Sequence, residues 1–204
     1  FRTYKISKMI LPIVAYGDPV LKVRAKQIDK DFPNLKEFIN NMWETMYNAN
    51  GVGLAAPQIG FSIRVFIVDT SPFADSNTMD EDEFNVLKSF KKVMINPMLV
   101  EETGKEWVFN EGCLSIPEVR SDIIRLNNIL IKYYDEDFKL HQNSYDGIIA
   151  RVIQHEYDHI EGTLFTDKLS PLKRKLIKGK LKNISLGKVE TDYEMKFNKS
   201  IKNR

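Results

Sequence analysis

The sequence predicts an α+β fold, with mixed, mainly antiparallel sheets around a central helix and a further helix near the C-terminal end. Its 204 residues, 43% hydrophobic and 28% charged, have the composition of one globular domain. Strand-like segments are followed by one helical segment in mid-chain and one near the end, rather than alternating with helices as in a parallel α/β protein. No apolar run approaches the roughly 20 residues that a membrane-spanning helix requires.

The spacing of apolar residues predicts three helices. The first covers residues 34–48, where apolar side chains recur every three to four positions, and the second covers residues 146–160 in the same way. The third begins after Ser170, a favourable N-cap, with Pro171 in its first turn, and runs to about Lys182.

Segments rich in β-branched residues predict strands over residues 63–69, 93–100 and 129–134. Residues 138–142 are expected to pair back on the last of these. Between the first two strands, the polar residues 70–92 contain an acidic cluster, which predicts a surface excursion.

The net charge of +2 conceals an uneven distribution. Residues 171–204 hold eleven Lys/Arg and three Asp/Glu, so the remainder of the chain is net acidic. A basic tail on an acidic body favours either a polyanionic partner or a solvated charged helix. The single cysteine excludes an intrachain disulfide, which favours a reducing, cytoplasmic location.

The sequence His155-Glu156-Tyr157-Asp158-His159 carries the strongest chemical signal. Residues four apart share one face of a helix, so both imidazoles can bind the same metal ion. Glu156 follows the first histidine directly and lies near enough to accept a proton from an activated water. The alternative is a pair of helix-face histidines, one of them in the core.

A catalytic metal site usually takes three protein ligands and leaves one position open. No histidine follows His159, and the downstream glutamates lie in no motif context of a metalloprotease. These are Glu161, Glu190 and Glu194. Cys113, the only cysteine, lies upstream, and a thiolate with two imidazoles suits a divalent transition metal. Because a lone cysteine is also often a small buried hydrophobe, both interpretations stay open at this point.

Three motifs together resemble the signature of the peptide deformylase family, in that family's order. They are Gly51-Val52-Gly53-Leu54-Ala55-Ala56-Pro57-Gln58, Glu111-Gly112-Cys113-Leu114-Ser115 and Gln154-His155-Glu156-Tyr157-Asp158-His159. Two shorter stretches, Gly17-Asp18-Pro19-Val20-Leu21 and Ser170-Pro171-Leu172-Lys173, are similar as well. The resemblance therefore runs from about Met9 to about Lys182.

The resemblance defines the expected domain organisation. Residues 9–182 would form a catalytic domain that includes the basic helix from about residue 171. Residues 1–8 would be a leader, with Met9 as the natural initiator. Residues 183–204 would be a C-terminal extension.

The resemblance implies a metal-dependent hydrolase that removes the N-formyl group from the N-terminal methionine of newly synthesised polypeptides and releases formate. It implies Fe²⁺ as the usual metal, with Zn²⁺, Ni²⁺ or Co²⁺ able to replace it. Carried over by position, the metal ligands are Cys113, His155 and His159. Glu156 would be the acid/base residue. Gln58 and the backbone N–H of Leu114 would stabilise the oxyanion.

The resemblance also implies how the substrate binds. The backbone around Val52 and Gly53 would hold the peptide in extended form. The methionine side chain would enter an apolar pocket lined or adjoined by Phe109, Ile148 and Val152.

We expect three charged residues, Arg151, Glu111 and Arg120, to lie at or near this pocket. Arg151 departs from the apolar residue that the family pattern leads us to expect, and we expect it at the pocket mouth with its stem along the wall. Glu111 is expected to support the site, paired with Arg120.

The implied partners are N-formyl-methionyl nascent peptides, and a basic C-terminal helix of this kind implies contact with ribosomal RNA. No membrane or DNA partner is expected. Two other functions compete with this interpretation. A zincin-like metalloendopeptidase would use the two histidines with another ligand and would not need Cys113. A non-enzymatic metal-dependent or RNA-binding module would be indifferent to Glu156→Gln.

Overall fold

The computed structural model describes residues 9–198, so the expected leader and residues 199–204 of the expected extension lie outside it. The strands are β1 (Ile13–Val14), β2 (Gly53–Ala55), β3 (Val65–Asp69), β4 (Lys91–Cys113), β5 (Ile116–Tyr134), β6 (Leu140–Asp146) and β7 (Met195–Lys196). The α-helices are α1 (Leu35–Asn48), α2 (Glu81–Ser89), α3 (Gly147–Ile160) and α4 (Pro171–Ser185). Short 3₁₀ turns cover Pro19–Lys22, Ala56–Ile59, Ser71–Phe73 and Phe165–Lys168.

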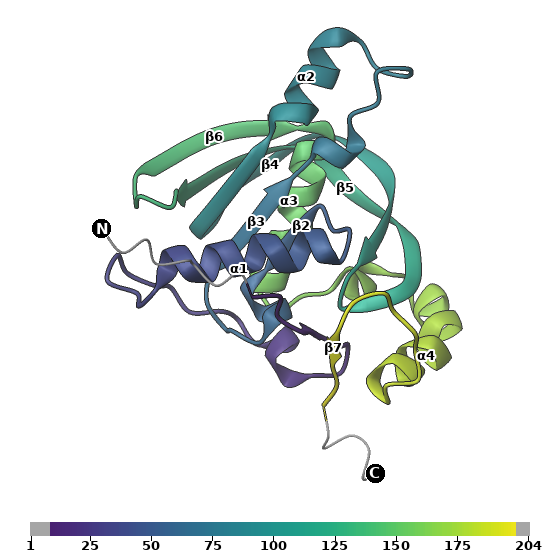
Figure 1. Cartoon of the computed structure of the whole chain (residues 1–204). Coiled ribbons are helices and arrows are strands. Elements are labelled where there is room, and N and C mark those ends of the chain that lie inside the picture. The colour runs from purple at the N-terminus through teal and green to yellow at the C-terminus, as the bar shows by residue number, and fades with distance from the viewer. Residues whose placement is uncertain (1–8, 199–204) are drawn as a thin grey trace.

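Five strands form one sheet in the order β2-β3-β4-β5-β6, with every neighbouring pair antiparallel (Figure 1). The strands β1 and β7 form a separate parallel pair. The predicted α+β fold with mainly antiparallel sheets, a central helix and a C-terminal helix is confirmed.

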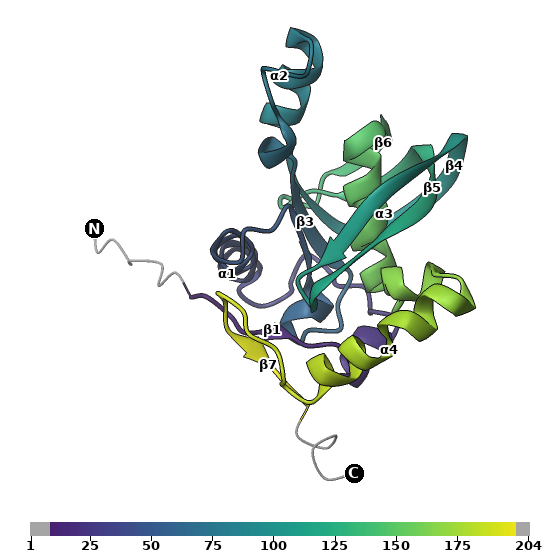
Figure 2. The same ribbon diagram turned by 90° about the vertical axis from the view of Figure 1, so that its right-hand side faces the viewer.

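Strand β3 lies between two helices, and all five of its residues are buried. Figure 2 shows α1 on one side of β3 and α3 on the other. Because successive side chains of a strand point to opposite faces, Phe66 and Val68 join the core around α3. Val65 and Ile67 join the core around α1. This explains why the strand reads as a continuous apolar run.

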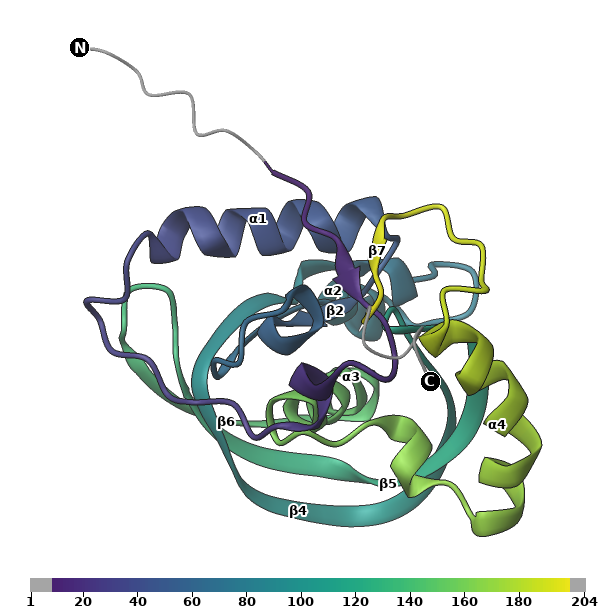
Figure 3. The ribbon, with the colours of Figure 1, turned by 90° about the horizontal axis from the view of Figure 1, so that it is seen from below.

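The strands β4 and β5 form a long hairpin that curves around α3 (Figure 3). The predicted strands over residues 93–100 and 129–134 are only parts of this hairpin. In the rest of the hairpin exposed residues are interspersed with buried and half-buried ones, so they carry no continuous apolar run. The predicted pairing of residues 138–142 with the end of β5 is confirmed for residues 140–142, which begin with the register Leu140↔Tyr134.

The excursion over residues 70–92 is attached to the core. The hydroxyl of Thr70 donates to the carbonyl oxygen of Leu87 at 2.8 Å. Phe73 and Met79 pack against the core around α3, whereas residues 75–78 and most of α2 are exposed. The segment is therefore a surface excursion that is anchored to the core.

The helix α4 begins as predicted. The hydroxyl of Ser170 accepts a hydrogen bond from the backbone N–H of Lys173 at 3.3 Å. After Ser185 the chain turns back and reaches β7, which lies beside β1. The boundary expected near residue 182 stays a prediction.

Candidate active site

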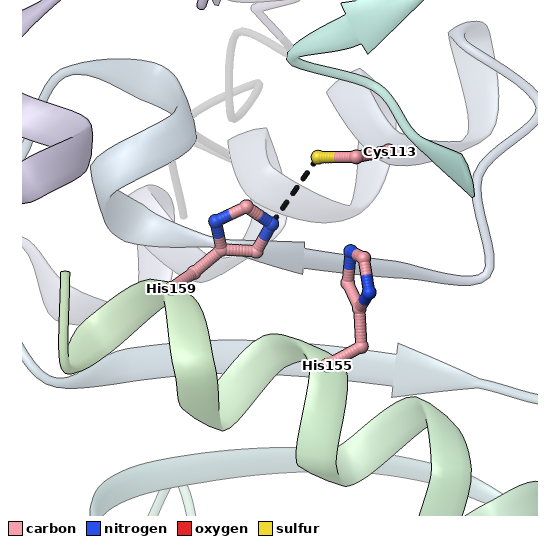
Figure 4. A group of neighbouring side chains, drawn as sticks. All are labelled: Cys113, His155 and His159. Atoms are coloured by element: carbon pink, nitrogen blue, oxygen red, sulfur yellow. Dashed lines mark hydrogen bonds between the residues drawn. The ribbon is translucent and has the colours of Figure 1, made fainter. Parts of the chain in front are cut away.

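The helix α3 places both histidines of the motif on its buried face. The exposed fractions are 9% for His155 and 1% for His159. Their ring centroids lie 5.0 Å apart in an edge-on arrangement. Figure 4 shows both rings projecting from α3 toward Cys113. Burial lowers the pKa of His159 well below its ordinary value, which keeps the ring neutral and able to bind a cation.

Cys113 is the last residue of β4, and its thiol lies beside the two histidine rings. Its Sγ lies 3.3 Å from Nε2 of His159, and the three donor atoms of Cys113, His155 and His159 all lie within 4.8 Å of one another. Ligands of a tetrahedral ion at about 2.0–2.3 Å lie about 3.3–3.8 Å apart, so one divalent ion fits between these donors. A thiolate with two imidazoles also suits a transition metal chemically.

Glu111 orients the first histidine. Nδ1 of His155 lies 2.9 Å from Oε2 of Glu111, which leaves Nε2 of His155 for a metal. Arg125 donates to both carboxylate oxygens, at 2.7 and 3.0 Å, and Arg151 donates to Oε1 at 2.9 Å. Burial alone would raise the pKa of Glu111, but the bonds from His155 and Arg125 hold it well below its ordinary value. The carboxylate is therefore charged.

The expected pairing of Glu111 with Arg120 is wrong. Arg120 is exposed and donates to the side-chain and backbone oxygens of Asn110, at 2.9 and 2.6 Å. In the β4–β5 register Arg120 lies opposite Gly112, the neighbour of Glu111, so its side chain points to the other face of the hairpin.

The expected position of Arg151 at the pocket mouth is also wrong. Its side chain is 1% exposed, and its guanidinium carbon lies 4.5 Å from the centre of the Trp107 ring. Nη2 donates to the carbonyl oxygen of Trp107 at 2.8 Å. The charge is thus neutralised by Glu111 and covered by an aromatic face, which permits burial of an arginine beside the pocket.

Glu156 projects into the site from α3 and is 3% exposed. Burial raises its pKa to about 7, near the value that suits a group which both takes and gives a proton. Gly53 lies directly against its carboxylate, since a Cβ built on Gly53 would come 2.3 Å from Oε1 of Glu156. Only glycine therefore fits beside this carboxylate.

The amide of Gln58 is held in a fixed orientation. Its Oε1 accepts a hydrogen bond from the backbone N–H of Ala55 at 2.7 Å, and its Nε2 donates to Sγ of Cys113 at 3.5 Å. The N–H end of the amide therefore faces the thiol of Cys113. Leu114 lies in the turn between β4 and β5, directly after Cys113.

A cavity of about 630 Å³ opens in front of these groups. Of the expected site residues, it is lined by Val52, Gly53, Gln58, Phe109, Glu111, Cys113, Leu114, Val152, His155 and Glu156. Ile148 and His159 are not among the lining residues, and Ile148 packs at the edge of the core around α3. The lining residues that sequence reasoning did not name include Phe73, Val119 and Tyr193, and Arg151 lines the cavity as well.

The site thus combines a cysteine and two histidines, a buried carboxylate beside the first histidine, an amide donor and a cavity. Three soft protein donors that leave room for a fourth ligand are typical of a catalytic metal site. The fold and the site together define a metal-dependent hydrolase.

Comparison with known proteins gives the family. The polypeptide deformylase family model matches residues 10–175. The peptide deformylase of Christiangramia forsetii is 64% identical over 189 residues, which cover 93% of this chain and 96% of that protein. The peptide deformylase of Flavobacterium johnsoniae is 59% identical over 196 residues, covering 96% and 100%. The chain belongs to the polypeptide deformylase family.

Solved structures agree with this assignment. The crystal structure of a peptide deformylase from Legionella pneumophila has a TM-score of 0.73 and 36% identity, covering 88% of this chain and 98% of that one. The peptide deformylase from Thermotoga maritima has a TM-score of 0.69 and 39% identity, covering 80% and 99%.

The chain is accordingly a metal-dependent hydrolase that removes the N-formyl group from N-terminal methionine of newly made polypeptides. The endopeptidase and non-enzymatic interpretations find no support. Within residues 9–198, no helix has the length and apolar character needed to span a bilayer.

Proposed function

We propose that deformylation takes place on a ferrous ion held by Cys113, His155 and His159, with Glu156 as the acid/base residue. The observation that carries this proposal is the convergence of the three donor atoms within 4.8 Å of one another, beside the buried carboxylate of Glu156. Zn²⁺, Ni²⁺ or Co²⁺ would be accepted by the same donors. Cys113, His155 and His159 would hold a divalent ion, which would supply Lewis-acid chemistry to water and to the formyl oxygen.

Glu156 is proposed to handle the proton. Oε2 of Glu156 is buried and has no hydrogen-bond partner among the described residues, so it is available to a water or to the substrate. Its carboxylate would accept the proton of the attacking water and then deliver it to the departing amine. The backbone of Gly53, which lies directly against the Glu156 side chain, would hold the carboxylate in place during both proton transfers.

Gln58 and Leu114 are proposed to stabilise the negative charge that develops on the formyl oxygen. The Nε2–H of Gln58 faces the site because its Oε1 is fixed by Ala55. The backbone N–H of Leu114 would be the second donor. Each such donor typically contributes about 10²–10³ in rate.

The peptide is proposed to bind along β2, which is an edge strand of the five-stranded sheet. Among residues 9–198, nothing pairs with one side of its backbone around Val52 and Gly53, so an extended peptide can add to it. Small residues here leave a narrow slot beside the metal, which would admit a formyl group and resist the extra methyl of an acetyl group by about 1–3 kcal/mol.

The methionine side chain is proposed to enter the cavity between Phe109 and Val152, with Ile148 nearby. Arg151 would close this pocket from behind, because its guanidinium lies 4.5 Å from the Trp107 ring and 5.7 Å from the Phe109 ring. The pocket would therefore combine aromatic walls with a neutralised charge.

A metal and activity analysis tests the assignment of the site. Formate release from formyl-Met-Ala-Ser would be measured for wild type, Cys113→Ala and Glu156→Gln, all prepared anaerobically with Fe²⁺. We expect both variants to be inactive, with metal lost only from Cys113→Ala. A Cys113→Ala protein that keeps metal and activity would exclude the thiolate as a ligand. Elemental analysis of wild type purified without oxygen or added metal would exclude iron if another ion predominated.

We further propose a cytoplasmic location and contact between α4 and ribosomal RNA. The helix presents exposed lysines, among them Lys175, Lys178 and Lys182, next to the exposed side chains of Leu172 and Leu176. Replacing these three lysines with glutamate should abolish cosedimentation with ribosomes while deformylation is retained. Binding that does not weaken as salt is raised would contradict an electrostatic contact.

A further inference from the structure

The chain after α4 returns to the active site. Residues 188–196 are here called the C-terminal strap. The strap ends in β7, which Figure 2 shows beside β1. Four strap residues line the same cavity as Cys113 and Glu156, namely Glu190, Thr191, Asp192 and Tyr193. The strap lies beyond residues 10–175, the part matched by the family model. Membership of the family therefore assigns it no role.

Tyr193 connects the strap to the turn that follows Cys113. Its hydroxyl donates to the carbonyl oxygen of Leu114 at 2.8 Å. The hydroxyl of Thr191 donates to the carbonyl oxygen of Tyr193 at 2.7 Å, which fixes the strap backbone at this point. Burial, together with the charge of Cys113, raises the pKa of Tyr193 to about 12, so its hydroxyl remains a donor near neutral pH.

The residues that follow β1 hold the same turn. The backbone N–H of Tyr16 donates to the carbonyl oxygen of Ser115 at 2.8 Å. The backbone N–H groups of Ile13 in β1 and of Ala15, directly after β1, donate to carbonyl oxygens of the strap, each at 2.9 Å. Both carbonyl groups of the Leu114–Ser115 turn are therefore bonded to one unit, formed by β1 and the strap.

We propose that Tyr193 is a positioning residue for deformylation, whose hydroxyl holds the turn so that the Leu114 N–H points at the developing oxyanion. This inference rests on the proposed role of Leu114. The carbonyl bonded by Tyr193 and the N–H of Leu114 belong to the two peptide groups that meet at the Leu114 Cα, so a displacement of this Cα moves both. A donor stabilises the transition state only when it is aimed at the atom where charge develops.

The test is Tyr193→Phe, which removes one oxygen atom and keeps the ring. Steady-state kinetics would be measured on the ferrous holoenzyme with formyl-Met-Ala-Ser, together with metal content and unfolding temperature. Because the oxyanion forms only in the transition state, we expect kcat to fall about tenfold, KM to stay within about twofold, and metal content to be unchanged. The loss is smaller than that of a deleted donor because the N–H remains present.

Tyr47→Phe is the matched control. Tyr47 lies on α1, outside the cavity, and in the wild type its hydroxyl donates to Oδ2 of Asp69 at 2.6 Å. We expect this variant to lose stability and to keep kcat. Tyr193→Phe with unchanged kcat would overturn the inference, and so would a loss of activity that follows loss of metal or of fold. An inactive wild type would overturn the proposed function as well, whereas an active wild type with an equally active variant overturns the role of Tyr193 alone.

Discussion

Gly53→Ala provides a sharp test of the proposed active site, because the change adds a single methyl group. A Cβ at this position would lie 2.3 Å from Oε1 of Glu156, 2.7 Å from Cδ and 2.8 Å from Cγ. The backbone of Gly53 is not in the left-handed region, so alanine itself meets no backbone strain. The three nearest contacts of the added methyl group are all with Glu156.

The expected magnitude follows from these distances. Ordinary contacts begin near 3.4 Å, so Oε1 of Glu156 must move by about 1.1 Å. The whole side chain must shift, because Cγ and Cδ are too close as well. A misplacement of about 1 Å in a catalytic group can lower a rate about 10²-fold, equivalent to about 2.7 kcal/mol in the activation barrier. Overpacking should also lower the free energy of unfolding by about 1–3 kcal/mol.

The assay is formate release by the ferrous enzyme, with metal content and thermal unfolding measured on the same samples. Gly179→Ala is the control, because a Cβ on Gly179 meets nothing within 4 Å and the residue lies in α4. We expect this control to be fully active and more stable by about 0.5–1 kcal/mol. We take a change of about threefold in kcat as the resolution of such assays. If metal-loaded Gly53→Ala keeps kcat within that range, the position of Glu156 does not matter for catalysis.

Three further changes probe the surroundings of the site. Gln58→Ala should lower kcat about 10²–10³-fold at unchanged metal content, and an unaffected kcat would remove this amide from the oxyanion site. Arg125→Met should weaken metal affinity about 10–100-fold in chelator competition, because it loosens the carboxylate that orients a metal ligand; equal affinity would contradict that role. Burial raises the pKa of Asp69, but hydrogen bonds from Ser71 and Tyr47 lower it overall from 3.8. The charged Asp69 carboxylate therefore stabilises the folded protein above its ordinary pKa of 3.8, and this stabilisation is lost as the pH falls through the lower pKa of the folded state. The unfolding free energies of wild type and Asp69→Asn should differ at pH 7 and converge near pH 2.

Much of the fold was predictable because its signals are local. The helices α1, α3 and α4 have apolar faces that repeat within a few residues, and the cap at Ser170 is a property of neighbouring residues. Two of the proposed ligands were visible for the same reason, since His155 and His159 are four residues apart on one helix. Cys113 lies more than forty residues upstream of these histidines, so only the resemblance to a family assigned it as the third ligand.

The partner of Glu111 was not predictable because it depends on strand register. In the hairpin, Ser121 lies opposite Glu111 and Arg125 opposite Trp107. Trp107 and Glu111 are four residues apart on one strand, so Arg125 shares the face of Glu111 whereas Arg120 does not. A shift of one residue would have reversed this choice, and nothing in the sequence fixes the register.

The buried arginine and the strap were missed for a different reason. A side chain such as Arg151 is normally exposed, and its burial depends on Glu111 and Trp107 arriving from β4. Tyr193 lies in a polar stretch without apolar periodicity, so its contact with Leu114 is purely tertiary.

The parallel pairing of β1 with β7 has a kinetic consequence. Residue 13 must meet residue 195 before the turn after Cys113 is restrained on both sides. Closing so large a loop is among the slowest kinds of contact to form in a refolding chain. During renaturation, recovery of enzymatic turnover should therefore lag behind the return of helical circular dichroism.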